Sequence, residues 1–193
     1  MKLKNSADGF GLIAILLHWL MALVIVALFV VGTYMVDLDY YDNNYHIAPW
    51  WHKSFGLFIG LLLVFRIFWR LINPKVNELS ILGQAPSYKP LEINLAKAMQ
   101  YLLYVLIMIC CISGYLISTA DDVGVSLFDW FEFPALISHG EQQAELAGEI
   151  HEYSTLALII LTSLHALAAL KHHFVDKDKT LIRILKTYTG EKL

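Results

Sequence analysis

Four long apolar segments constrain the fold of this chain more than any other feature. They cover about residues 12–36, 50–72, 95–120 and 151–170. A helix needs roughly 20 apolar residues to cross a bilayer, and each segment reaches or approaches that length. Only 16% of the 193 residues are charged and 58% are hydrophobic, unlike a soluble domain. Because a segment in lipid must pair its own backbone groups, the sequence predicts an all-α membrane protein with four transmembrane helices.

The stretches between these segments indicate one domain. Residues 73–94 form a polar connection, and residues 121–149 form an acidic loop with the aromatic patch LFDWFEF. We expect this patch at a membrane interface, where aromatic side chains collect. No sequence repeat, glycine-rich phosphate loop or strand-like alternation is apparent. We therefore expect a single four-helix membrane domain over residues 1–193, with a basic tail over residues 171–193.

Lysine and arginine fall almost entirely on one side of the predicted membrane. Of the 14 such residues, only Lys53 lies on the other side. The remaining thirteen are Lys2, Lys4, Arg66, Arg70, Lys75, Lys89, Lys97, Lys171, Lys177, Lys179, Arg183, Lys186 and Lys192. Because positive charge is enriched in cytoplasmic loops, this distribution predicts that both termini and the 73–94 connection are cytoplasmic.

Histidines occur at matched depths in three of the four segments. His18 and His165 each lie six residues in from the cytoplasmic end of a segment, about 9 Å along a helix axis. His52 and His151 open their segments on the outer side. The spacing of 14 between His151 and His165 corresponds to about 21 Å and returns to nearly the same helix face. The sequence predicts two sites, one from His18 and His165 and one from His52 and His151.

A pair of histidines inside a membrane suits haem better than a bare metal ion. Ionisable residues in a span are costly and indicate a functional site. Haem iron has four porphyrin nitrogens, so two axial imidazoles complete its coordination and favour electron transfer. Zinc or copper could also bind a histidine pair, but no carboxylate or thiolate lies at the depth of His18 and His165 to complete a set. Scattered interface histidines are the remaining alternative.

Two cations and two glycines lie close to the predicted ligands. Arg66 follows His52 by 14 residues, so it shares that helix face at the depth of the cytoplasmic pair. There it could neutralise haem propionates, and extension of its side chain to the headgroups is the alternative. Lys53 could pair with an outer propionate or with the acidic loops. Gly56 and Gly60 leave room for a neighbouring helix or for a porphyrin plane.

Three parts of the sequence resemble one known family. They are LLHWL in the first segment, WHKSFG and RIFWR in the second, and EIHEYSTLALIILTSLHALAALKHHFVDKDKTLIR at the end. They are similar to the bacterial cytochrome b561 family over about residues 10–186. The resemblance implies a four-helix inner-membrane cytochrome with two haem b groups, ligated by His18 with His165 and by His52 with His151. An activity described in this family is superoxide:ubiquinone oxidoreductase, so ubiquinone is implied as a substrate.

The predicted outer side is strongly acidic. Its acidic residues are Asp37, Asp39, Asp42, Asp121, Asp122, Asp129, Glu132, Glu141, Glu145, Glu149 and Glu152. Their summed field would repel an anionic donor such as superoxide unless Lys53 offsets it locally, and it would suit a cationic redox protein or a neutral quinol. The alternative is that the acidic loops only mirror the cytoplasmic bias of the basic residues.

Together these features predict a di-haem b-type cytochrome that carries electrons across the inner membrane and exchanges them with ubiquinone. We expect no general acid, base or nucleophile, so an enzyme of this kind would be an electron-transfer oxidoreductase. One alternative is a haem-bearing membrane-anchor subunit of a larger respiratory oxidoreductase. Another is a non-haem metal carrier or a structural membrane protein. The expected partners are membrane lipid, quinone and a soluble redox protein, with no nucleic acid.

Overall fold

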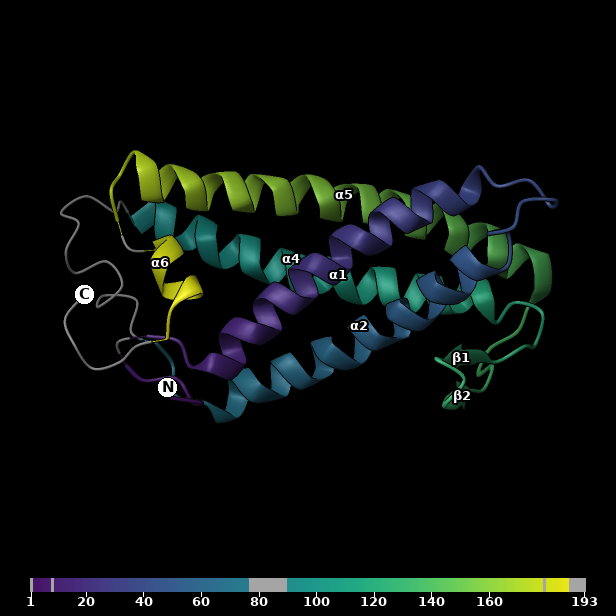
Figure 1. Ribbon diagram of the computed structural model, residues 1–193, viewed down its shortest axis with the longest axis horizontal. Helices are drawn as coiled ribbons and strands as arrows, with labels where there is room; N and C mark the ends of the chain where they lie inside the picture. Colours follow the sequence, from purple (N-terminus) through teal and green to yellow (C-terminus); the bar gives the residue numbers. More distant parts are fainter. Residues whose placement is uncertain (1, 8, 77–89, 179, 188–193) are drawn as a thin grey trace. The chain divides into compact units, whose positions relative to one another are not determined.

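Four long helices form most of the chain in the computed structural model (Figure 1). They are α1 (Leu12–Val36), α2 (Ile47–Ile72), α4 (Pro90–Ser118) and α5 (Gly140–Phe174). The structure describes residues 2–7, 9–76, 90–178 and 180–187. All four helices are long and apolar enough to cross a membrane, and exposed side chains such as Leu23 and Val64 give them apolar surfaces for lipid. The predicted all-α fold with four membrane-spanning helices is confirmed.

Parts of the predicted connection and tail lie outside the described residues. These parts are residues 77–89, with Lys89, and residues 179 and 188–193, with Lys179 and Lys192.

The ends of the last helix differ from the prediction. We expected a loop up to residue 149, but α5 begins at Gly140 and continues to Phe174. Residues 140–150 are polar yet rich in Ala, Glu, Gln and Leu, which favour helix. The side-chain carbonyl of Gln143 accepts a hydrogen bond of 3.0 Å from the backbone N–H of His139. This bond caps the N-terminus of α5. Hydropathy locates the apolar middle of such a helix and misses its polar extension.

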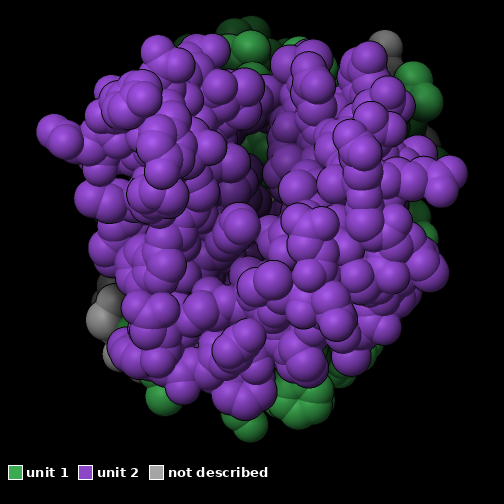
Figure 2. Space-filling model, turned by 90° about the vertical axis from the view of Figure 1, so that its right-hand side faces the viewer, with its two compact units in different colours: residues 1–20, 64–102, 161–193 green, residues 21–63, 103–160 purple. Residues whose placement is uncertain are grey.

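The four helices contribute to two compact units, which have different colours in Figure 2. Unit 1 consists of residues 1–20, 64–102 and 161–193, and unit 2 of residues 21–63 and 103–160. In unit 1 the indole N–H of Trp19 donates a hydrogen bond of 2.8 Å to the backbone carbonyl of Ile184. This bond ties α6 (Thr180–Leu185) to the first helix.

Unit 1 also contains an ion cluster at the C-terminal end of α5. Lys171 Nζ and His172 Nδ1 both lie 2.7 Å from a carboxylate oxygen of Asp176. The hydrogen bond from Lys171 holds the pKa of Asp176 below its ordinary value. The neighbouring Asp178 accepts the backbone N–H of Thr180 at 2.8 Å and so caps α6. The basic tail is therefore structured up to this point by local acidic partners.

Unit 2 contains a short hairpin that the sequence did not predict. Strands β1 (Val125–Leu127) and β2 (Phe131–Phe133) pair antiparallel within the aromatic patch. The hydroxyl of Ser54 on α2 donates to the carbonyl of Ser126 and accepts the backbone N–H of Phe128, both at 3.2 Å. Each strand has three residues, which is too short to show an alternating pattern, and side chains of α2 hold the hairpin in place.

Candidate metal centres

The first centre lies in unit 1. The imidazole of His18 on α1 and that of His165 on α5 stand 6.4 Å apart between ring centroids, at an interplanar angle of 67°. Both side chains are half-buried. Arg66 on α2 joins them, with its Nη2 atom 3.2 Å from His18 Nδ1. The structure therefore brings together the three residues that sequence spacing had placed at one depth.

The second centre lies in unit 2. His52 on α2 and His151 on α5 have ring centroids 6.2 Å apart and an interplanar angle of 80°. These rings are also half-buried. The two pairs thus share nearly the same separation, although different helices build them.

Both separations suit a metal held between two imidazoles. A bond from a metal to a histidine nitrogen is about 2 Å long, so a metal bound by two rings holds their centroids roughly 6 Å apart. Among the residues that the structure describes, no group of three or more His, Cys, Asp and Glu could hold a metal ion. Pairs alone suit haem, whose porphyrin supplies the other four nitrogens. That these four histidines bind iron remains a prediction.

Hydrogen bonds fix the tautomer of His151. Its Nδ1 atom lies 3.0 Å from the backbone carbonyl of Cys110 and 3.1 Å from the hydroxyl of Ser113. A carbonyl can only accept, and the Ser113 hydroxyl already donates to the carbonyl of Ile109 at 2.7 Å. Nδ1 of His151 therefore carries the proton and donates it. The lone pair of Nε2 is left free for a metal, as in other metal-binding histidines.

His52 is held differently from His151. Its buried Nδ1 atom has no hydrogen-bond partner among the residues that the structure describes, although the backbone of Leu28 lies nearby. The ring packs instead against Gly32 on α1, where a Cβ atom would come within 3.0 Å of it. The restraints visible on this ring are therefore its packing against Gly32 and the backbone of Leu28 beside it.

Open space lies beside both histidines of unit 2. Gly56 is one turn after His52 and Gly148 is one turn before His151, so each glycine shares the helix face of its histidine. A Cβ atom at either glycine would meet nothing within 4 Å. The face of unit 2 that is turned to the viewer in Figure 2 is hollowed in its middle. Gly56 and Gly148 therefore leave room beside His52 and His151 for a flat group such as a porphyrin.

The other glycine of the predicted ridge has a different role. A Cβ atom at Gly60 would lie 3.7 Å from Sγ of Cys111 on α4, an ordinary packing distance. Gly60 therefore admits a neighbouring helix, the first of the two readings that the sequence allowed.

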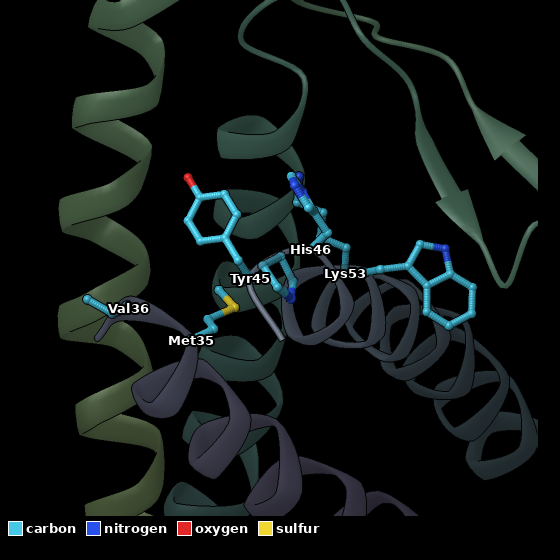
Figure 3. A pocket seen from close by; sticks show the side chains of 7 residues that line it. Met35, Val36, Tyr45, His46 and Lys53 are labelled. Atoms are coloured by element: carbon cyan, nitrogen blue, oxygen red, sulfur yellow. The ribbon is translucent and has the colours of Figure 1, made fainter. Parts of the chain in front are cut away.

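Lys53 lies beside a surface cavity rather than against a described carboxylate oxygen. The cavity has a volume of about 490 Å³ and is also lined by Met35, Tyr45 and His46. Figure 3 shows Met35 at the end of α1, with Tyr45, His46 and Lys53 around the same space. The side chain of Lys53 is exposed. Its predicted pairing with a propionate therefore has weaker geometric support than that of Arg66.

Comparison with known proteins matches this architecture to one family. The sequence matches prokaryotic cytochrome b561 over residues 9–187. The chain belongs to the prokaryotic cytochrome b561 family. As a prokaryotic cytochrome b561 it is a multi-pass bacterial membrane protein, a b-type cytochrome that carries electrons. The resemblance seen in the histidine motifs is confirmed.

Three relatives cover nearly the whole chain. Cytochrome b561 homolog 2 of Escherichia coli (strain K12) is 42% identical over 185 residues, which are 96% of this chain and 95% of the relative. The probable superoxide oxidase CybB of Yersinia pestis is 29% identical over 182 residues, 90% and 94% of the two chains. Cytochrome b561 homolog 1 of E. coli (strain K12) is 26% identical over 183 residues, 92% and 97%.

The sequence patterns did not identify Gly32 and Ser113, which contact this cytochrome's histidines. Gly32 lies 14 residues after His18, the same spacing that separates His151 from His165, so this spacing could have located it. Ser113 has no such signal, because a serine in an apolar helix is usually bonded to its own backbone. The third long helix, α4, has no histidine of its own but supplies the partners of His151.

Proposed function

We propose that this cytochrome holds two haem b groups, one between His18 and His165 and one between His52 and His151. The observation that carries the proposal is the pair of ring separations, 6.4 and 6.2 Å, each within one compact unit. Haem would supply a one-electron iron couple at each site, and the two imidazoles of each pair would hold it. The protein contributes ligands, a low-dielectric surrounding and fixed orientation.

Arg66 has a role at the unit 1 site that follows from proton positions. A guanidinium can only donate, so Nδ1 of His18 accepts its hydrogen bond, and Nε2 of the neutral ring carries the proton. A neutral ring cannot keep this arrangement and also bind a metal through Nε2. We infer that Arg66 releases Nδ1 when His18 becomes a ligand and turns to a carboxylate of the haem. Lys53 is the corresponding candidate at the unit 2 site.

The two sites support electron transfer across the membrane, with ubiquinone as the exchange partner. The helix α5 carries a histidine for each site, separated by 14 residues. With both termini in the cytoplasm, the pair of His18 and His165 would serve the cytoplasmic side and the pair of His52 and His151 the outer side. The membrane would be the bacterial inner membrane.

A difference spectrum tests the haem assignment. The measurement is the reduced-minus-oxidised visible spectrum of detergent-purified protein, with haem per chain for wild type, His18→Ala and His52→Ala. We expect two b-type haems in wild type and the loss of mainly one in each variant. One haem in wild type would show that one pair is wrong, and no haem after expression with sufficient haem supply would refute both. A soluble protein that co-purifies would favour the anchor-subunit alternative.

Reporter fusions test the orientation. Alkaline phosphatase is active only outside the cytoplasm, so a fusion after residue 193 should be inactive and a fusion after residue 42 should be active. A fluorescent protein that folds only in the cytoplasm should give the opposite result at both positions. The reverse pattern would overturn the orientation drawn from the lysines and arginines.

Superoxide oxidation is a second candidate function. It comes from the similarity to the Yersinia pestis relative, whose name describes a probable superoxide oxidase. The acidic residues of unit 2 oppose it, because eleven carboxylates against Lys53 alone would repel an anion. If superoxide is nevertheless the donor, its consumption should require ubiquinone, and Lys53→Glu should slow it several-fold while leaving reduction by dithionite unchanged.

A further inference from the structure

Two glycines contact the histidines of unit 2 in the same way. A Cβ atom at Gly32 would come within 3.0 Å of Cε1 and 3.4 Å of Nδ1 of His52. A Cβ atom at Gly114 would come within 3.0 Å of Cε1 and 3.3 Å of Nδ1 of His151. Each ring therefore lies with the same edge against a neighbouring helix, at a point where that helix has no side chain.

This arrangement repeats in two separate helix pairs. Gly32 belongs to α1 and His52 to the following helix α2, while Gly114 belongs to α4 and His151 to the following helix α5. In unit 1 a Cβ atom at Gly11 would meet the backbone of the N-terminal segment and not a histidine. The same glycine contact occurs in two helix pairs of unrelated sequence. This indicates that both imidazoles need a neighbouring helix position without a side chain.

A methyl group at either position would displace the imidazole. Carbon atoms pack best at about 3.5–4.0 Å, so at a contact of 3.0 Å the ring must give by a few tenths of an ångström. Metal sites tolerate deviations of only about 0.2 Å in their bond lengths. A ring shift of this size is comparable with that tolerance, so it changes the length or the direction of a bond from the imidazole to a metal.

We propose that Gly32 and Gly114 are positioning residues of the unit 2 haem site, which set where the imidazoles of His52 and His151 stand. This inference rests on the proposed ligation. The glycines act through the histidines, because each lies against the Cε1–Nδ1 edge of its ring and farther from the nitrogen Nε2, at 3.8 and 3.9 Å.

The two positions differ in how far the ring can yield. His151 donates from Nδ1 to the carbonyl of Cys110 and the hydroxyl of Ser113, so it cannot swing away without breaking these bonds. At His52 the backbone of Leu28 lies beside the ring, but Nδ1 forms no hydrogen bond of ordinary geometry with a described residue. A methyl group at Gly114 therefore pushes against a firmly held ring, whereas a methyl group at Gly32 meets a ring that is held less firmly. Gly114→Ala should have the larger effect.

The experiment compares Gly32→Ala and Gly114→Ala with the control Gly60→Ala. All three substitutions favour helix equally, but at Gly60 the methyl group would lie 3.7 Å from Cys111 Sγ, an ordinary contact. The readouts are haem per chain, the midpoint potential of each haem and the electron paramagnetic resonance spectrum of the ferric protein. The haem bound by His18 and His165 serves as an internal control, because its presence shows that the chain has folded.

For Gly114→Ala we expect a loss of haem affinity at the unit 2 site on the order of tenfold, typical of groups that orient a metal ligand. For Gly32→Ala we expect retained haem with altered ferric g values and a shifted potential. Gly60→Ala and the unit 1 haem should match wild type.

Unchanged g values and potentials in both variants would overturn the inference. An equal disturbance from Gly60→Ala would do so as well, because it would show a general effect of the methyl group. Failure of the proposed function is recognised separately, since wild type itself would then lack two haems.

Discussion

His18 of unit 1 is contacted by an arginine, whereas the described contacts of the histidines of unit 2 are with glycines, a backbone carbonyl and a serine. The net charges of the two units differ in the same direction, with unit 1 positive and unit 2 negative. Unit 1 has 13 basic and six acidic residues, a net charge of +7, and unit 2 has one basic and eleven acidic residues, a net charge of −10. Two sites with almost the same ring separation therefore lie in opposite fields.

This difference shows that coordination and electrostatics are set independently. The ring separation follows from where the helices place the histidines, and it is nearly equal in the two units. A positive surrounding favours reduced iron, because reduction removes positive charge. We therefore expect the unit 1 haem to have the higher midpoint potential.

The largest effect should come from the histidines of α5. His151→Ala should remove mainly the unit 2 haem, His165→Ala mainly the unit 1 haem, and the double variant should be colourless. Haem quantification of the three purified proteins checks this. A double variant that keeps one haem would show that at least one pair does not use α5.

Arg66→Gln should lower the midpoint potential of the unit 1 haem and leave the unit 2 haem unchanged. Loss of one half-buried positive charge near the iron is worth on the order of 50–100 mV for a one-electron couple. Lys53→Gln is the matched control, and because Lys53 is exposed we expect a shift within about 20 mV at the unit 2 haem. A redox titration followed in the visible spectrum measures both. Equal shifts at the two haems would remove the electrostatic distinction between the units.

Ser113→Ala should raise the potential of the unit 2 haem by roughly a few tens of millivolts. A hydrogen bond from Nδ1 makes the imidazole a stronger electron donor to ferric iron, and this variant removes one of its two acceptors. Ser118→Ala is the control on the same helix, because its hydroxyl donates to the carbonyl of Gly114. A fall in potential, or an equal rise in the control, would contradict the proposed role of Ser113.

The smallest effect concerns the ion cluster at the C-terminal end of α5. Because the pKa of Asp176 is lowered in the folded protein, its stabilising contribution is present at neutral pH and disappears as the pH falls below about 4. Asp176→Asn should speed proteolysis of the tail at pH 7 by less than about fivefold, as for an exposed ion pair. At pH 7 the difference should be present, and near pH 3 variant and wild type should unfold alike. A difference in proteolysis rate between variant and wild type that grows as the pH is lowered would contradict this prediction.

Much of this architecture can be predicted because lipid imposes simple rules. The four helices follow from apolar length, and the spacing of 14 residues between His52 and Arg66 anticipates that Arg66 lies near His18. Helix spacing therefore identifies which side chains share a depth.

Other features depend on contacts that no local pattern shows. The hairpin depends on Ser54 of a distant helix, and Phe128 at its turn has a φ of 51°, which aromatic residues seldom adopt. This conformation is held by rings from α2, among them Phe55 at 5.1 Å between centroids. Likewise Ser113 is recognised only once His151 is seen against it.

The position of α5 in the chain has a consequence for biogenesis. In the proposed ligation each haem needs one histidine from α5, which is the last of the four long helices to leave the ribosome. The pair of His52 and His151 is incomplete until residue 151 has been synthesised and inserted, and the pair of His18 and His165 until residue 165. Haem capture must therefore follow insertion of the first three helices, which wait in the membrane with His18 and His52 unligated. A chain that stops before α5 would insert into the membrane without binding haem stably. Cellular quality control could recognise such a chain by its empty haem sites.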